Sequence, residues 1–157
     1  MSGTMALDAI FQLEMGGAPP ADTAVMFTTG ERRVIVLRHG PPDNAVFAEI
    51  QFDSAAFAAR GSPVQVTVRP RPGVYGVTIE SGTPFTTATL TFKYAVHFLD
   101  PTGARARYGS DIAYERALGI ARLDGANVTF IPSTRPALDN LAARVTLPGT
   151  YLVAAPR

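Results

Sequence analysis

The sequence lacks two residue types that carry much of protein chemistry, because it contains neither cysteine nor tryptophan. Without cysteine the chain forms no disulfide bond and offers no thiolate nucleophile. It also has no cysteine ligand for zinc or an iron–sulfur cluster. Histidine is nearly absent as well, since His39 and His97 are the only two. These absences leave few routes to catalysis or to metal binding.

The sequence also lacks long apolar runs and an N-terminal targeting pattern. No segment approaches the roughly 20 apolar residues that are needed to cross a bilayer. Met1–Met15 contains no basic residue and has Asp8 inside its apolar stretch, which is unlike a secretory signal. We therefore expect a cytoplasmic protein without a transmembrane segment, either free or peripheral to the inner membrane. If the chain is a processed form, we expect a periplasmic protein instead.

Glycine and proline are abundant and spread along the chain, which indicates many short strands joined by turns. There are 14 glycines and 13 prolines in 157 residues, a length that suits one domain. The clearest strand signal is Thr87–Phe98, where apolar residues alternate with other residues as in a strand with one buried face. Further strands are predicted at Val64–Val68, Leu141–Leu147, Ala24–Thr29, Arg32–Arg38, Ala45–Phe52, Gly73–Glu80, Leu118–Arg122, Asn127–Ile131 and Thr150–Ala154.

Turn motifs separate these strands. Asp124-Gly125 is typical of a two-residue hairpin, and Thr29–Glu31 predicts another tight turn. His39–Asn44 holds two prolines and is expected to be a longer loop. Ser54–Ala59 is expected to form one helical turn, capped by Asp53 or by its own first residue. The whole pattern predicts an all-β fold, a two-sheet antiparallel β-sandwich of Ig-like or Greek-key type with one short helical turn.

The N-terminal segment is set apart from this body by the Gly- and Pro-rich linker Gly16–Asp22. Alternate positions from Met5 to Met15 are apolar, which favours a strand, although Thr4 as a cap would also suit a helix that ends at Gly16. We predict an arm and linker at residues 1–22 and a β-sandwich domain at residues 23–157. The arm contains acidic residues and no basic one, which suits electrostatic docking to a partner.

Three stretches of the chain carry a resemblance to a known family. They contain a strand that ends in a small helical turn, a Gly-Thr-x-Phe turn before a long alternating strand, and a closing hairpin with a last strand. The stretches are Glu49–Phe57, Ser81–Phe85 with Ala88–Tyr94, and Leu118–Gly125 with Val128–Ser133 and Gly149–Val153. With these motifs, residues 31–156 resemble bacterial sandwich domains of the ZU-five type, which are related to the domain shared by ankyrins and netrin receptors.

The resemblance implies a protein-interaction or structural module without an enzymatic site. Some members of the family cleave themselves at a His-Phe-Ser sequence before the last strand, where the serine hydroxyl attacks the preceding peptide bond. The corresponding residues here are Leu147-Pro148-Gly149, which supply neither a base nor a hydroxyl. The resemblance therefore implies that this chain does not cleave itself.

A catalytic or metal site would need one of a few residue combinations. His39 with Asp43, or His97 with Asp100, would give a general base, but no Gly-x-Ser-x-Gly nucleophile motif accompanies either pair. We expect both histidines to face solvent and predict no catalytic residue and no enzyme.

Two other site types find little support in the sequence. Asp100 with Asp111, or Asp111 with Glu115, would give at most a weak calcium site, so we predict no metal and no cofactor. The basic clusters Arg69–Arg71 and Arg105–Tyr108 belong to a chain of net charge +1. This charge is low for a nucleic-acid-binding domain, so we predict no nucleic-acid partner.

The most suitable contact surface is the predicted loop Leu99–Ile112, together with the N-terminal arm. Tyrosine and arginine are the residues that anchor many protein interfaces, and the loop is rich in both. The predicted partner-binding residues are Asp8, Phe11, Leu13, Arg105, Arg107, Tyr108 and Tyr114.

These observations predict a non-enzymatic structural or protein-interaction subunit that braces a larger bacterial assembly. Assemblies associated with a membrane are within this prediction. An extrinsic accessory subunit of a photosynthetic reaction-centre and antenna complex is one example, which no motif requires. Its partners would be other protein subunits. The alternative is a carbohydrate-binding or adhesive β-sandwich module, against which the lack of tryptophan counts because such sites display aromatic platforms.

Overall fold

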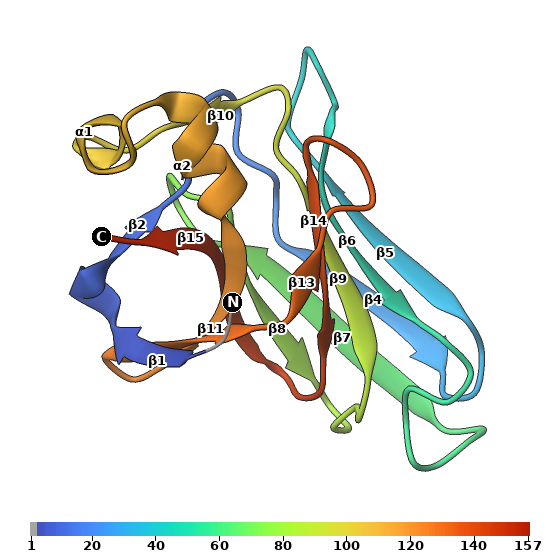
Figure 1. Cartoon of the computed structure of the whole chain (residues 1–157). Coiled ribbons are helices and arrows are strands. Elements are labelled where there is room, and N and C mark those ends of the chain that lie inside the picture. The colour runs from blue at the N-terminus through green and yellow to red at the C-terminus, as the bar shows by residue number, and fades with distance from the viewer. Residues whose placement is uncertain (1–2) are drawn as a thin grey trace.

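Two antiparallel β-sheets pack face to face in the computed structural model, which describes residues 3–157 (Figure 1). The larger sheet runs in the order β1 (Gly3–Ala6), β12 (Asn127–Ile131), β11 (Gly119–Asp124), β15 (Gly149–Pro156), β8 (Gly76–Ser81), β7 (Pro63–Pro70) and β4 (Thr23–Thr28). The short β2 (Ile10–Gln12) also pairs with β15. The smaller sheet runs in the order β13 (Ser133–Thr134), β14 (Asn140–Val145), β9 (Ala88–Lys93), β6 (Val46–Phe52) and β5 (Arg33–Arg38). The predicted all-β sandwich is confirmed.

The remaining elements gather at one end of the sandwich. β3 (Glu14–Met15) and β10 (Phe98–Leu99) form a two-stranded ribbon, and η1 (Leu7–Ala9) joins β1 to β2. The helices α1 (Ala104–Tyr108) and α2 (Asp111–Ala117) lie at the same end as β2 and the C-terminal end of β15 (Figure 1). No helix within residues 3–157 is long and apolar enough to cross a membrane.

The main core lies between the two sheets and follows from the alternating residues of the strands. Val64, Val66 and Val68 of β7 point inward and are buried, and so are Leu90 and Phe92 of β9. Burying one such side chain contributes about 1.5–3 kcal/mol relative to leaving it exposed. The period-two pattern therefore decides which face of each sheet is hidden, as the sequence predicts.

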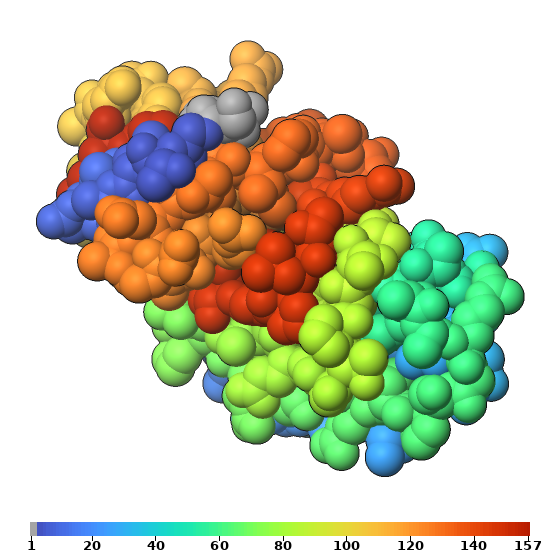
Figure 2. All heavy atoms as spheres, turned by 90° about the horizontal axis from the view of Figure 1, so that it is seen from below, coloured from blue at the N-terminus to red at the C-terminus, as the bar shows by residue number. Residues whose placement is uncertain are grey.

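The strand β15 is buried on both faces, because the N-terminal arm folds across the outer face of the larger sheet. Val153 faces the main core, whereas Leu152 and Ala154 belong to a second, smaller core with Ile10 and Phe130. Figure 2 shows the arm from Gly3 onward (blue) lying against residues of β11 and β12 (orange). The sequence of β15 is correspondingly apolar without alternation.

The arm itself is a broken strand that belongs to the larger sheet. β1 pairs with β12 and β2 pairs with β15, so the boundary expected at residue 22 does not separate two units. The turn η1 shifts the phase of the chain: Ile10 enters the second core, whereas Phe11, Leu13 and Met15 enter the main core. The strand prediction was right in type, but it missed this break.

Three local predictions were wrong. The alternating strand expected at Thr87–Phe98 ends at Lys93, because Ala95–His97 turn the chain toward β10. The helical turn expected at Ser54–Ala59 is a series of non-helical bends, in which Asp53 Oδ1 accepts a hydrogen bond from the Ala55 amide at 2.8 Å. The loop expected at Leu99–Ile112 instead contains α1 and the start of α2.

The predicted hairpin at Asp124-Gly125 is present, but its two turn residues are Gly125 and Ala126, one residue later than expected. Asp124 pairs with Asn127 at the end of the β11–β12 ladder, so Gly125 and Ala126 form the turn. Gly125 has φ +61°, a conformation that favours glycine. The glycine therefore serves the role that the sequence indicated.

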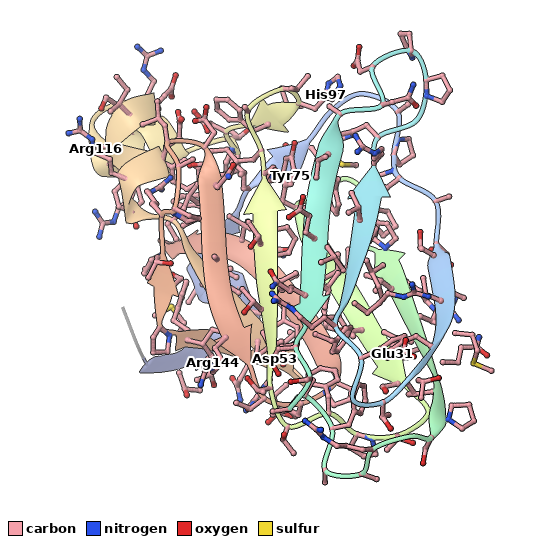
Figure 3. All side chains as sticks on the ribbon, turned by 90° about the vertical axis from the view of Figure 1, so that its right-hand side faces the viewer. Glu31, Asp53, Tyr75, His97, Arg116 and Arg144 are labelled. Carbon is pink, nitrogen blue, oxygen red and sulfur yellow. The ribbon has the colours of Figure 1, made fainter. Side chains whose placement is uncertain are left out.

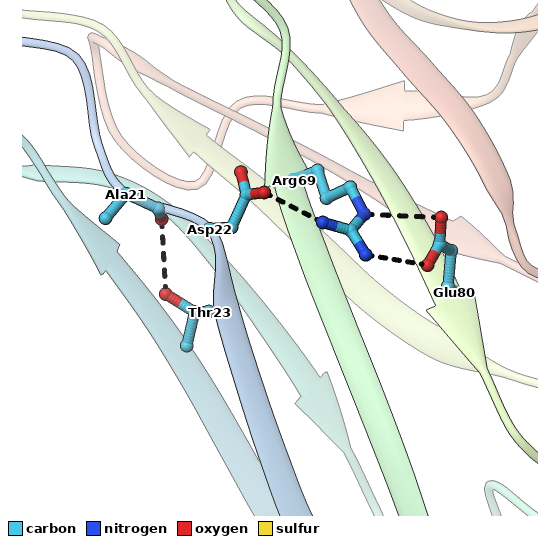
Figure 4. A network of polar contacts seen from close by, with 5 residues as sticks. All are labelled: Ala21, Asp22, Thr23, Arg69 and Glu80. Carbon is cyan, nitrogen blue, oxygen red and sulfur yellow. Dashed lines mark hydrogen bonds and ion pairs between the residues drawn. The ribbon is translucent and has the colours of Figure 1, made fainter.

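The linker is attached to the larger sheet by a surface ion-pair network (Figure 4). Arg69 of β7 donates to Asp22 Oδ2 at 2.8 Å and, at 3.4 Å, to each carboxylate oxygen of Glu80 on β8. All three side chains are about half exposed, so water screens these ion pairs and they contribute little to stability. The network fixes the direction in which the linker enters β4 more than it stabilises the fold.

Candidate functional site

The two segments predicted to bind a partner pack against each other. The rings of Phe11 and Tyr114 meet edge to face with centroids 6.3 Å apart, and the Tyr114 hydroxyl donates to the Phe11 carbonyl at 3.0 Å. Burial raises the pKa of Tyr114, so its hydroxyl remains a proton donor. The arm and the Arg- and Tyr-rich segment therefore form one intramolecular contact at the end of the sandwich.

This contact corrects three of the predicted partner-binding residues. Leu13 has an exposed fraction of 0 %, Tyr114 is equally buried, and Phe11 is nearly so. The predictions for Phe11, Leu13 and Tyr114 were wrong, because their side chains fill the end of the main core and are not available to another molecule. An apolar pattern in a terminal segment does not distinguish a free docking arm from a strand of the core.

The other four predicted residues remain at the surface. Asp8, Arg105 and Arg107 are exposed, and Tyr108 is half-buried with its hydroxyl donating to the Pro156 carbonyl. The Arg107 guanidinium lies 4.8 Å from the centre of the Tyr108 ring. Their role in binding a partner stays a prediction.

An open cavity of about 670 Å³ separates the arm from the turn at Pro101-Thr102 and contains Asp8 and Phe11 in its wall. Arg157 lines it as well, with its guanidinium 4.6 Å from the centre of the Phe11 ring and its Nε donating to the Ile10 carbonyl at 3.2 Å. Glu14 also lines the cavity. Its wall therefore carries charged groups of both signs beside apolar side chains.

A second cavity, of about 420 Å³, lies between α2 and the segment that precedes β14. We call it the α2 cleft. Its rim bears two large apolar side chains, since Ile112 is 63 % exposed and Leu138 is 84 % exposed. The α2 cleft is lined by Tyr94, Ile112, Glu115, Arg116, Arg135, Leu138 and Asp139.

Arg135 holds the α2 cleft in shape. Its Nη1 donates to the Tyr94 hydroxyl and, at 3.0 Å, to the Leu138 carbonyl, and its Nη2 donates to the Glu115 carbonyl at the C-terminal part of α2. The guanidinium also lies 5.8 Å from the centre of the Tyr94 ring. One side chain thus ties three segments together, and a site that is already ordered loses less entropy on binding.

Three carboxylates, those of Asp100, Asp111 and Glu115, lie on α2 or in the segment before it, and they are the residues from which the sequence would build at most a weak calcium site. Asp100 Oδ1 is buried and has no hydrogen-bond partner within residues 3–157. Burial, and then the charge of Asp111, raise the pKa of Asp100 to about 6. Burial also raises the pKa of Glu115. Within residues 3–157, no group of three or more His, Cys, Asp or Glu side chains is placed so that it could hold a metal ion.

His97 lies at one end of the sandwich (Figure 3), where its ring packs on that of His39 beside the linker. His97 Nε2 lies 2.5 Å from Asp43 Oδ2, and its ring centroid lies 4.5 Å from that of His39. His39 is only 2 % exposed and donates from Nδ1 to the Ala18 carbonyl at 3.1 Å. The expectation that His39 faces solvent was wrong, and the observed His–Asp pair is neither of the two considered from the sequence.

This cluster joins loops and has no nucleophile beside it. Within residues 3–157, no serine or threonine hydroxyl is hydrogen-bonded to either imidazole. Burial is the main cause that lowers the pKa of His39, which keeps the buried ring neutral. The cluster connects the linker, the Pro-rich loop and the segment before β10.

Sequence reasoning missed the α2 cleft because its residues come from separate segments. Leu138 is the one large apolar residue in the polar stretch Ser133–Asn140, and an isolated leucine of this kind is the signal that would have found it. Arg135 lies in the same stretch, but nothing in the sequence indicates that it contacts Tyr94.

The chain matches no protein-family model, and comparison with curated proteins and with solved structures finds no significant similarity to any of them. The resemblance to ZU-five domains therefore stays a prediction.

Proposed function

We propose that this chain is a non-enzymatic protein-interaction subunit of a larger assembly, and that the α2 cleft is the surface through which it binds a protein partner. The observation that carries the proposal is the exposure of Ile112 and Leu138 at the rim of one cavity. Exposed apolar groups beside a preformed cavity are characteristic of binding sites, whereas scattered single residues are not.

The composition of the α2 cleft supports a protein ligand. Aliphatic side chains lie beside Arg116 and Arg135, with Glu115 and Asp139 as balancing carboxylates. Interfaces combine an apolar centre with a polar rim, and arginine and tyrosine are enriched in them. A partner that inserts an apolar side chain and places polar groups around it would match this arrangement.

A glycan ligand has less support from the same surface. All 14 phenylalanine and tyrosine residues lie within residues 3–157, and none of them is classed as exposed. The flat aromatic platform on which sugars stack is therefore missing from the part of the chain that the structure describes. We accordingly propose a protein partner and not a carbohydrate.

The proposal is tested by photo-crosslinking from inside and outside the α2 cleft. A photoreactive amino acid is placed at position 112 or 138 of the full chain, and at position 147 as the control, since Leu147 is also exposed but lies outside the cleft. The expected result is one dominant protein crosslinked in an extract of the native source from positions 112 and 138 and not from position 147.

The crosslinked protein is then purified and titrated against the parent chain and two variants. Leu138→Asp is expected to weaken binding by at least about tenfold, because a hot-spot side chain contributes roughly 2 kcal/mol or more. Leu147→Asp is expected to leave the dissociation constant unchanged. Equal crosslinking from all three positions, or equal binding by the two variants, would overturn the proposal.

A further inference from the structure

Both sheets end on the same side of the sandwich, at two strands that follow each other in the chain. β4 is the last strand of the larger sheet and β5 is the last strand of the smaller one, and a short turn at Thr29–Arg32 connects them. Among residues 3–157, β4 pairs only with β7, and β5 pairs only with β6. Figure 3 views the molecule from the smaller sheet, with Glu31 marking the turn.

Part of the free side of β4 is occupied by the chain itself. Arg33 donates from Nη2 to the Met26 carbonyl at 3.2 Å, and its guanidinium lies 5.7 Å from the centre of the Phe27 ring. The Glu31 amide donates to the Thr28 carbonyl at 3.2 Å. Two of the carbonyl groups that β4 would offer to another strand are therefore already used.

The free side of β5 is not occupied in this way. Within residues 3–157, the only backbone or side-chain hydrogen bonds to the backbone of Arg33–Arg38 come from its partner β6. An edge strand paired on one side points about half of its amide and carbonyl groups outward, where they form a template for another strand. Val34 and Val36, which are 49 % and 37 % exposed, add apolar side chains to this edge.

The charge along β5 selects the kind of strand that fits it. Arg32, Arg33 and Arg38 are all exposed, and residues 32–38 contain no acidic residue. If two copies of the chain paired through β5 in antiparallel registers centred on the strand, Arg38 would face Arg32 or Arg33 of the other copy. Like charges placed opposite each other on adjacent strands are destabilising, so the arginines disfavour self-association and favour an acidic strand.

We propose that β5 is an acceptor edge for an extended, acidic segment of a partner protein, which adds a sixth strand to the smaller sheet. Backbone hydrogen bonds of the added strand would supply affinity, and its side chains would supply selectivity. Carboxylates would face Arg32 and Arg38, and apolar side chains would lie beside Val34 and Val36. This surface is separate from the α2 cleft and does not depend on the function proposed for it.

The test uses a short synthetic peptide in which valine and glutamate alternate, added to the full chain. Nuclear magnetic resonance follows the backbone amides and their exchange with solvent. The expected result is slower amide exchange within Val34–Leu37 and chemical-shift changes that are largest in β5. Two control peptides are a version with lysine in place of glutamate, expected to bind at least about tenfold more weakly, and a glutamate version with central prolines, which cannot form the backbone ladder.

Charge-reversal variants make the test specific to β5. Arg32→Glu combined with Arg38→Glu is expected to exchange the preference, so that the lysine peptide binds more tightly than the glutamate peptide. Arg38 also donates to the Asn44 carbonyl, so the single variant Arg32→Glu serves if the double variant folds poorly. Arg32→Glu is expected to weaken binding of the glutamate peptide several-fold. Arg144→Glu, on β14 of the same sheet, is expected to leave that binding unchanged.

Four results would overturn the proposal. They are equal binding of the glutamate and lysine peptides, equal binding of the proline peptide, chemical-shift changes centred on α2, or dimerisation of the chain through β5 without peptide. Leu138→Asp is expected to leave peptide binding unchanged, so a failure at β5 is distinguishable from a failure at the α2 cleft.

Discussion

Asp43 and His97 join two loops at the end of the sandwich, with 2.5 Å between Asp43 Oδ2 and His97 Nε2. The His97 ring also packs on His39, which reaches the Ala18 carbonyl in the linker. Three segments far apart in the sequence thus meet through two imidazoles and one carboxylate. This end of the molecule should therefore respond to pH and to changes in side-chain size.

His39 is expected to make the protein less stable in mild acid. Burial, with a smaller effect from the nearby His97, lowers the pKa of His39 below its usual 6.5, although the Ala18 carbonyl and Asp43 oppose this. The unfolded chain therefore binds this proton more readily than the folded chain does. As a result, the free energy of unfolding falls as pH drops below about 6.5 and levels off below the folded pKa.

Urea denaturation of the parent chain and of His39→Phe between about pH 7.5 and pH 5 checks this expectation. The variant should lose less stability over that range than the parent, because phenylalanine keeps a ring in the core and removes the titrating group. Asp100 titrates in the same range in both proteins, so the difference between them isolates His39. Parallel pH profiles would contradict the assignment.

Gly17→Ala is expected to be more destabilising than Gly61→Ala. Both glycines have a positive φ, +75° and +76°, so an alanine at either position carries a similar backbone strain of roughly 1–2 kcal/mol. A Cβ at Gly17 would lie 2.6 Å from His97 Nδ1, whereas a Cβ at Gly61 would meet no atom within 4 Å.

The difference between these two variants measures how firmly Asp43 holds the His97 ring. Thermal unfolding of both at neutral pH is the measurement, and we expect Gly17→Ala to be less stable by on the order of 1 kcal/mol or more. Equal melting temperatures would mean that the ring moves aside freely. Combining Gly17→Ala with Asp43→Asn should reduce the difference.

Asp100→Asn is expected to stabilise the protein at neutral pH but not in acid. The pKa of Asp100 is raised from 3.8 to about 6, so the folded chain binds this proton more readily than the unfolded chain. Stability therefore falls as pH rises from about 4 to 6 and stays reduced above that range. Removing the charge should recover on the order of 1–2 kcal/mol.

Urea denaturation at about pH 7.5 and pH 4 separates the charge from other effects of the substitution. Asp124→Asn on the exposed β11–β12 hairpin is the matched control and should change little at either pH. If Asp100→Asn changed stability equally at both pH values, the gain would come from packing and not from the buried charge.

Local chemistry made much of this fold predictable from the sequence. Alternation located β7 and β14, and the Asp-Gly pair located the hairpin between β11 and β12, because both signals act within a few residues. The α1–α2 region was missed because its helices are short and rich in glycine at their ends. Ser110 caps α2 through a hydrogen bond from the Ala113 amide at 3.1 Å. A serine at this position is the sequence signal that would have predicted the start of α2.

The candidate surfaces were harder to predict, since each depends on residues that only the fold brings together. Arg135 shapes the α2 cleft through Tyr94 and the end of α2, which are distant in the chain. The edge position of β5 follows from sheet order, which a single sequence does not reveal. Phe11 and Leu13 illustrate a different error. Their sequence shows that they are apolar, but it does not show that they are buried in the main core of the same chain.

Leu13→Ala tests most directly whether the N-terminal arm is part of the fold or a docking segment. Leu13 is fully buried in the main core, and its amide donates to the Val153 carbonyl at 2.9 Å while its carbonyl accepts from the Tyr75 amide at 2.9 Å. Truncating such a leucine should lower the free energy of unfolding by about 2–5 kcal/mol. Urea denaturation measures this loss, and Leu138→Ala, which removes the same atoms from an exposed side chain, should change stability by less than about 0.5 kcal/mol. Equal and small effects would mean that the arm leaves the core in solution. A large loss for Leu13→Ala alone would mean that the arm is part of the folded core, so that any partner binds a molecule whose arm is already packed against its own sheets.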